Sequence, residues 1–195
     1  MDPDLRRQPP HHLNDFKLYV SDMEELKLPV NHYVTTMAKG LAFLHWECRV
    51  DGNGVEFVLG QPDGRPPIIS SPFLGDHTMW MIDYDRCAPA SMDEAGVECM
   101  VTAVLKKDHQ YPLPFSSDAT VQELWSAFSL QYLRSSLSFI EIRDVNRHEK
   151  DRMTCLAQKA LKGIELMYQI QAELEDPREE WKQQRLYQEE SGGKH

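Results

Sequence analysis

The apolar pattern over residues 149–176 restricts the fold more than any other feature of the sequence. Apolar residues recur there at three- and four-residue steps, and charged residues occupy the remaining positions, as on an amphipathic α-helix. The apolar face is wider than the two positions in seven of a coiled-coil seam. Such a face is normally buried against the helix's own domain. Its residues are Met153, Leu156, Ala157, Ala160, Ile164, Met167, Ile170 and Leu174.

Three further helices are predicted upstream. The stripe from Val30 to Leu44 follows Pro29, a residue that suits a first helical turn. Sequences of the capping-box type, at 91–94 and 120–123, predict helices over 92–106 and 121–135.

Gly40 lies inside the first of these helices. It lowers helix stability by about 1 kcal/mol relative to alanine, which favours a neighbour that packs close to it.

The long helix over 149–176 is therefore expected to dock on the two helices before it, which predicts a monomer. The competing arrangement is a projecting helix that forms a dimer through Met153, Ala160 and Met167.

A β-hairpin is predicted between the first helix and the later ones. Asp51-Gly52-Asn53-Gly54 is a strong turn signal, and residues 55–60 then form a strand. A loop rich in proline follows over 61–77, and the strand over 78–84 pairs antiparallel with the first. The predicted fold is mainly α (α+β). It is a helical domain with one small antiparallel hairpin.

Helix, hairpin and later helices must share one apolar layer. That layer is expected to bury Leu41, Leu44, Phe57, Ile82 and Val101. Trp80, in the second strand, and Trp125, on a helix stripe, are expected in the core as well.

The length of 195 residues is typical of a single folded domain. The segments expected are a disordered tail over 1–14, a domain over 15–148, the docking helix over 149–176 and a charged, flexible tail over 177–195.

Charge excludes several classes of partner. The net charge is −10, from 31 acidic and 21 basic residues, and Lys and Arg form no long run. Because phosphates are bound by clustered cations, neither nucleic acid nor an anionic membrane is expected as a ligand. No apolar stretch is long enough to span a bilayer, and the N-terminus does not resemble a signal peptide. A cytoplasmic or nuclear protein is expected.

The four cysteines, Cys48, Cys87, Cys99 and Cys155, are far apart in sequence. None of them has a second cysteine at the two- to four-residue spacing of a structural zinc site. In a reducing compartment they are expected to be half-buried small hydrophobic residues.

Four strings of sequence carry a family resemblance: those at 41–46, 54–60, 80–87 and 111–114. Together they resemble a fungal domain of unknown function, number 3669, whose members are often labelled zinc finger protein. The resemblance covers about residues 14–140. It implies no established activity, and the cysteine spacing does not support the zinc label.

A second resemblance is to the C-terminal lobe of kinase-like phosphotransferases, and it implies that the domain over 15–148 has the fold of such a lobe without an N-terminal lobe. In these enzymes a helix ending in Leu-His is followed by a strand, and then by a strand ending in Ile-Asp and an aromatic residue. The resemblance implies that Asp51 and Asn53 match the catalytic aspartate and the metal-binding asparagine, and that Asp83 matches the second metal-binding acid. Here Asp51 and Asn53 are two residues apart, whereas the enzymes place the pair five apart.

Other parts of such an enzyme are absent from the sequence. No glycine-rich loop precedes a lysine-bearing strand, and the first 28 residues are too few for an N-terminal lobe.

Each candidate site residue also has a structural interpretation. Asp83 and Asp85 are expected on one face of a strand, where they either share a cation or cap a turn. Asp51 and Asn53 are common turn formers. His45 is interpreted as a residue that complements the dipole at a helix C-terminus.

The function predicted is a non-catalytic, degenerate kinase-like module for interaction or regulation, with a protein partner and no cofactor. One alternative is a phosphotransferase that is truncated or needs a partner to complete its nucleotide site. The other alternative is a zinc-associated transcriptional regulator.

Overall fold

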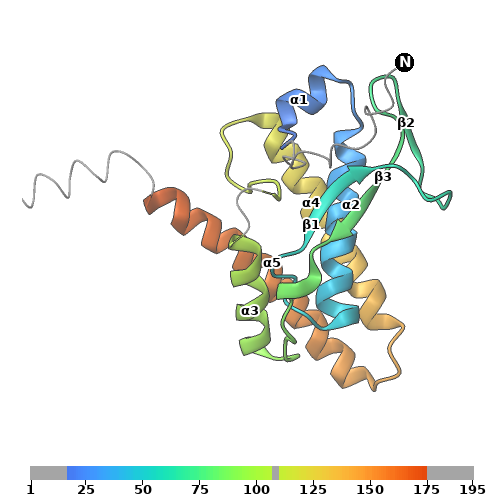
Figure 1. The fold of residues 1–195 in the computed structure, drawn as a ribbon. Coiled ribbons are helices and arrows are strands. Elements are labelled where there is room, and N and C mark those ends of the chain that lie inside the picture. The colour runs from blue at the N-terminus through green and yellow to red at the C-terminus, as the bar shows by residue number, and fades with distance from the viewer. Residues whose placement is uncertain (1–16, 107–109, 175–195) are drawn as a thin grey trace, which may run out of the picture.

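A computed structural model describes residues 17–106 and 110–174 (Figure 1). The prediction of a mainly α protein with a small antiparallel sheet is confirmed. Its elements are α1 (Val20–Glu25), α2 (Val30–Ala42), the π-helix η1 (Phe43–Cys48), β1 (Glu56–Gly60), β2 (Ile69–Ser71), β3 (Gly75–Ile82), the 3-10 helix η2 (Tyr84–Arg86), α3 (Glu94–Leu105), α4 (Ala119–Glu141) and α5 (Arg147–Leu174).

Aspartates cap the N-termini of α3 and α4. The Asp93 carboxylate accepts the backbone N–H of Gly96 at 3.0 Å, and the Asp118 carboxylate accepts that of Thr120 at 2.8 Å. Each satisfies a backbone donor that the first helical turn leaves without a partner. The predicted capping-box sequences lie at the starts of both helices, but the N-caps are Asp93 and Asp118 instead of Ser91 and Thr120, and α4 begins earlier and ends later than expected.

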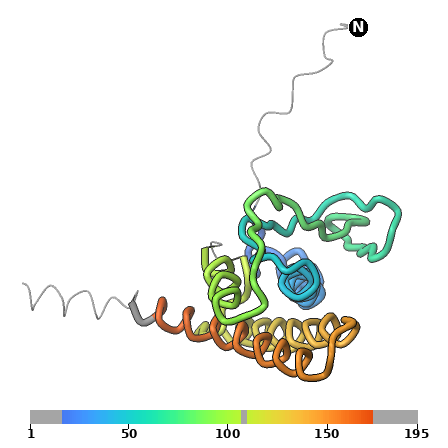
Figure 2. Tube along the Cα trace, turned by 90° about the horizontal axis from the view of Figure 1, so that it is seen from below, coloured from blue at the N-terminus to red at the C-terminus, as the bar shows by residue number. Residues whose placement is uncertain are grey.

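The elements form layers, with α2 in the middle. Viewed from below, the sheet lies on one side of α2, and α4 and α5 lie on the other (Figure 2). Small residues bring α2 close to its neighbours, since Ala38 and Ala42 are fully buried.

Helix α5 contacts both α3 and α4. Met153 and Ala160, two of the three residues of the alternative dimer face, are fully buried within the chain, and Met167 is 41% exposed. The apolar stripe of α5 is therefore largely used inside this molecule.

The sheet has three antiparallel strands in the order β1-β3-β2. The predicted hairpin is confirmed, because β1 pairs with β3 in a register that places Phe57 opposite Met81. The short strand β2 lies inside the segment 61–77, which was predicted as a loop, and pairs with residues 75–77 of β3.

The core contains part of the predicted layer. Leu41, Leu44 and Val101 are buried, and Phe57 is partly buried against them. The prediction for Ile82 is wrong, since it is 38% exposed. Alternate residues of a strand face opposite sides of the sheet, and Ile82 lies on the side away from α2.

The two tryptophan predictions have opposite outcomes. Trp125 is buried and stacks on Phe128, with ring centroids 5.6 Å apart. Trp80 is 37% exposed on the outer side of β3, so its assignment to the core is wrong.

The predicted tails over 1–14 and 177–195 lie outside the described residues. Among the helices of the described residues, none combines the length and apolar character that crossing a lipid bilayer requires.

Candidate functional site

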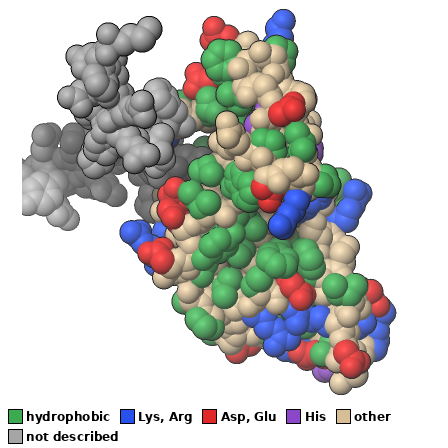
Figure 3. All heavy atoms as spheres, turned by 45° about the vertical axis from the view of Figure 1, so that its right-hand side comes forward, with side chains coloured by type: hydrophobic (Ala, Val, Ile, Leu, Met, Phe, Trp, Pro, Cys, Tyr) green, Lys and Arg blue, Asp and Glu red, His purple; other side chains and the backbone are tan. Residues whose placement is uncertain are grey.

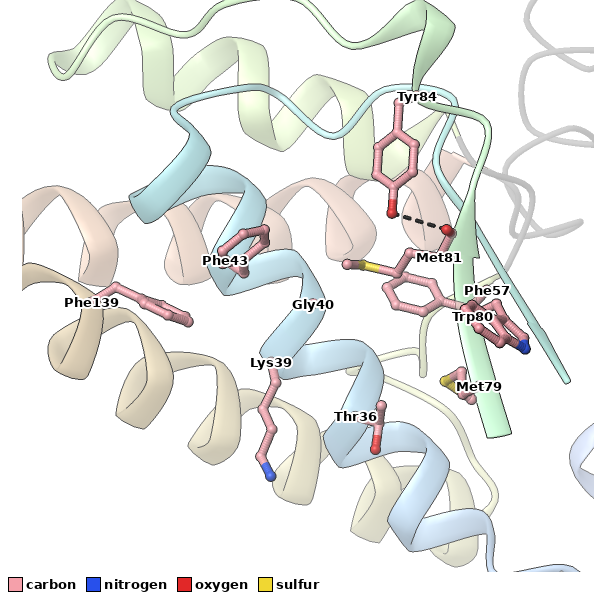
Figure 4. Close-up of a pocket in the computed structure, with 10 residues that line it drawn as sticks. All are labelled: Thr36, Lys39, Gly40, Phe43, Phe57, Met79, Trp80, Met81, Tyr84 and Phe139. Carbon is pink, nitrogen blue, oxygen red and sulfur yellow. Dashed lines mark hydrogen bonds between the residues drawn. The ribbon is translucent and has the colours of Figure 1, made fainter. Parts of the chain in front are cut away.

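An open apolar groove lies between α2, α4 and β3 (Figure 4). Its volume is about 570 Å³. Apolar side chains gather on the face of the molecule that carries α2 and the sheet (Figure 3). The apolar part of the groove's lining consists of Phe43, Phe57, Met79, Met81 and Phe139.

Gly40 allows the sheet to approach α2 at the floor of this groove. A Cβ atom at this position would lie 2.7 Å from Met81 Sδ and 2.8 Å from Phe57 Cε1, closer than side-chain atoms normally pack. The close neighbour expected from the sequence at Gly40 is therefore the inner face of the hairpin.

Aromatic residues form two edges of the groove. Phe43 packs edge-on against Phe139, with ring centroids 5.7 Å apart, and remains 38% exposed. Tyr84 is 49% exposed, and its hydroxyl donates to the Met81 carbonyl at 2.9 Å. Methionine and aromatic side chains adapt to partners of different shape, and aromatic residues are enriched in protein interfaces.

Lys39 supplies the charge of the groove. It is exposed, and it forms no salt bridge with any described residue. The neighbouring Thr36 hydroxyl donates to the His32 carbonyl at 2.8 Å. The groove thus offers apolar surface and one cation.

Asp51 is a structural residue of the loop after η1. One carboxylate oxygen accepts the backbone N–H of Asn53 at 3.0 Å and that of Ala88 at 2.9 Å. Positive φ angles at Gly52 and Gly54 complete the turn. The contacts of Asp51 and Asn53 are therefore those of turn-forming residues.

Asp83 and Asp85 lie beyond the end of β3. Asp83 has φ +60° and begins η2, of which Asp85 is a member. The expectation that both lie on one face of a strand is wrong, because the chain turns after Ile82. Both side chains are exposed, and in the described residues no group of three or more His, Cys, Asp or Glu side chains could hold a metal ion.

His45 lies in the core instead of at an exposed helix end, so the interpretation as a dipole partner is wrong. Its ring is fully buried, with Nδ1 2.9 Å from the Tyr132 hydroxyl. That hydroxyl also accepts the indole N–H of Trp46 at 3.0 Å. The wider π-helical turn of η1 allows the consecutive residues Leu44, His45 and Trp46 all to be buried.

Burial lowers the pKa of His45 to about 4, and Asp51 offsets this effect only in part, first through its backbone and then through its negative charge. His45 Nε2 is buried and has no hydrogen-bond partner among the described residues. Sequence reasoning missed this polar cluster, because its members His45 and Tyr132 are 87 residues apart.

The cysteines are free and do not form a zinc site with other described residues. Cys48, Cys99 and Cys155 are exposed, so the expectation that they are half-buried is wrong for these three. Cys87 is half-buried, and its thiol donates to the Asn53 carbonyl at 3.4 Å. Burial raises the pKa of Cys87, which disfavours the thiolate that binds metals.

Comparison with known proteins gave one match. Residues 79–144 match the family model DUF3669, which is described as zinc finger protein. No curated protein and no solved structure matches the chain. The matched span contains Cys87 and Cys99, and its described residues do not fit a zinc ion. The predicted resemblance to this family is thus confirmed over residues 79–144, and this segment supplies the β3 and α4 sides of the groove.

Proposed function

We propose that this chain is a non-catalytic protein-binding module and that the groove between α2, α4 and β3 binds the partner. The observation that carries the proposal is the exposure of several large apolar side chains around one hollow. Phe43 and Tyr84 are each more than a third exposed there, and Phe57, Met79 and Met81 are only partly buried. Exposed apolar patches of this kind mark binding sites in soluble proteins.

A protein segment suits this groove better than a small polar metabolite. Apolar and aromatic side chains dominate the lining, and Lys39 is a single cation at the rim. Aliphatic or aromatic side chains of a partner would fill the hollow, and a partner carboxylate would pair with Lys39.

Descent from a kinase-like C-terminal lobe is part of the same proposal. Its support is the order of helix, loop and antiparallel hairpin, with Asp51 and Asp83 at the corresponding positions. The use of the Asp51 carboxylate by two backbone donors favours a module that has lost phosphotransfer.

The groove can be tested with phage-displayed random 12-residue peptides selected on the full-length chain. We expect selected peptides to lose about tenfold in affinity for Phe43→Ala, because large aromatic side chains are enriched among the interface residues whose truncation costs more than about 1 kcal/mol. Lys39→Glu should weaken acidic peptides by a similar factor.

The matched controls are Leu130→Ala and Lys162→Glu, which remove an exposed leucine of α4 and an exposed lysine of α5 away from the groove. Both should retain full affinity. Selected peptides that bind all four variants equally would refute the groove as the binding site.

The melting temperature in the presence of nucleotide and metal distinguishes this proposal from the phosphotransferase alternative. A non-catalytic module should show no rise in melting temperature with MgATP, Mg²⁺ or Mn²⁺, and Asp83→Asn should leave that result unchanged. A rise with Mg²⁺ or Mn²⁺ that disappears in Asp83→Asn would contradict the proposal and assign Asp83 to a metal site.

A further inference from the structure

We infer that the partner of this groove is an extended peptide segment that adds to the free edge of β3 as a new antiparallel or parallel strand. The inference rests on the proposed function, since it names the occupant of the same groove. Its basis is the place where the groove meets the sheet.

The groove meets β3 along an edge. Met79, Trp80 and Met81 all line it, although successive side chains of a strand point to opposite faces of the sheet. Three consecutive residues can border one hollow where the hollow runs beside the strand backbone. The other edge of β3 is covered, because β1 pairs with residues 78–82.

The edge of β3 that borders the groove extends beyond its strand partner β2. β2 pairs with residues 75–77 of β3 and goes no further. From Met79 to Ile82 this edge therefore has no strand partner among the described residues. An unpaired edge presents backbone N–H and C=O groups that another extended chain can bind.

The side chains beside this edge define what sequence the added strand should have. Residues that point toward α2 would meet Phe43 and Phe139, and the alternate residues would face solvent. Lys39, on the rim formed by α2, has no salt bridge with any described residue and favours an acidic residue in the peptide. The expected occupant thus alternates apolar and polar residues and carries at least one carboxylate.

The probes are the 12-residue peptides selected on the full-length chain, each resynthesised with single N-methylated backbone amides. N-methylation removes one N–H donor without changing a side chain. We expect about tenfold weaker binding when amides of one alternate set are methylated and little change for the other set, because a strand directs successive N–H groups to opposite edges.

Two results would overturn the inference and leave the proposed function intact. One is a set of peptides that need Phe43 but have apolar residues at helical spacing and tolerate N-methylation at alternate positions. The other is a concentration-dependent dimer in light scattering that Phe43→Ala disrupts, which would make a second copy of this chain the occupant. Peptides whose affinity does not change in Phe43→Ala would instead refute the proposed function.

Discussion

Replacing Leu44 by alanine should lower the free energy of unfolding by about 2–5 kcal/mol. Leu44 is 2% exposed at the point where η1 meets the loop that starts at Asp51. A Cβ atom at Gly52 would lie 3.5 Å from its Cδ1 atom, so loop and side chain are in close contact. Truncation would leave a cavity that this loop and α2 cannot fill without rearrangement. Urea unfolding followed by circular dichroism measures the loss.

Leu130→Ala is the matched control for this experiment. Leu130 lies on α4 and is 60% exposed, so the same truncation there should change the free energy of unfolding by no more than about 0.5 kcal/mol. If Leu44→Ala lowers the free energy of unfolding by less than about 1 kcal/mol, Leu44 is not packed in the core as described.

Acidification from pH 7 to pH 4.5 should lower the free energy of unfolding by about 2–3 kcal/mol through His45 alone. In the unfolded chain a histidine takes up a proton near pH 6.5. Burial lowers the pKa of His45 to about 4 in the folded protein, so the folded state resists that proton. The contribution of His45 is complete above pH 6.5 and is lost as the pH falls toward 4.

The hydrogen bonds of the cluster also favour a neutral His45. Because the Tyr132 hydroxyl accepts the Trp46 N–H, its own proton is free to bond to a neutral His45 at Nδ1. A protonated His45 would direct a second N–H at that hydroxyl and would leave a charged ring in the core.

Denaturant unfolding at several pH values tests this prediction. The loss of stability between pH 7 and pH 4.5 should shrink by about 2 kcal/mol in His45→Gln and persist in His32→Gln, which changes an exposed histidine of α2. An unchanged pH dependence in His45→Gln would assign the effect to another group.

The elements that the sequence predicted well are those with a strong local signal. The stripe of α5, the caps near Asp93 and the turn at 51–54 each depend on residues close in sequence. Local hydrogen bonds and helical periodicity determine such elements, and their approximate bounds follow.

The elements that the sequence did not predict depend on distant contacts. The apolar run Met79, Trp80, Met81 and Ile82 has the pattern of a strand buried on both faces, yet Trp80 and Ile82 are exposed. β2 has only three residues and lies in a segment rich in proline. The π-helix η1 follows a stripe that continued in α-helical spacing, so only tertiary packing distinguishes it.

The candidate site was missed for the same reason. The strong apolar character of β3 predicts a position in the core, and the acids after it suggest a metal site. In the structure the apolar residues border an open groove, and Asp51 holds a turn. Which face of a strand is covered depends on the layer packed against it, and no pattern within the strand contains that information.

Amide hydrogen exchange of the full-length chain, with and without a saturating selected peptide, tests the central claim most directly. Binding in the groove should slow exchange over residues 79–82 of β3 and over residues 36–43 of α2 and η1. Slowed exchange confined to α3 or α5, with residues 36–43 and 79–82 unchanged, would show that the peptide binds elsewhere and would contradict the account.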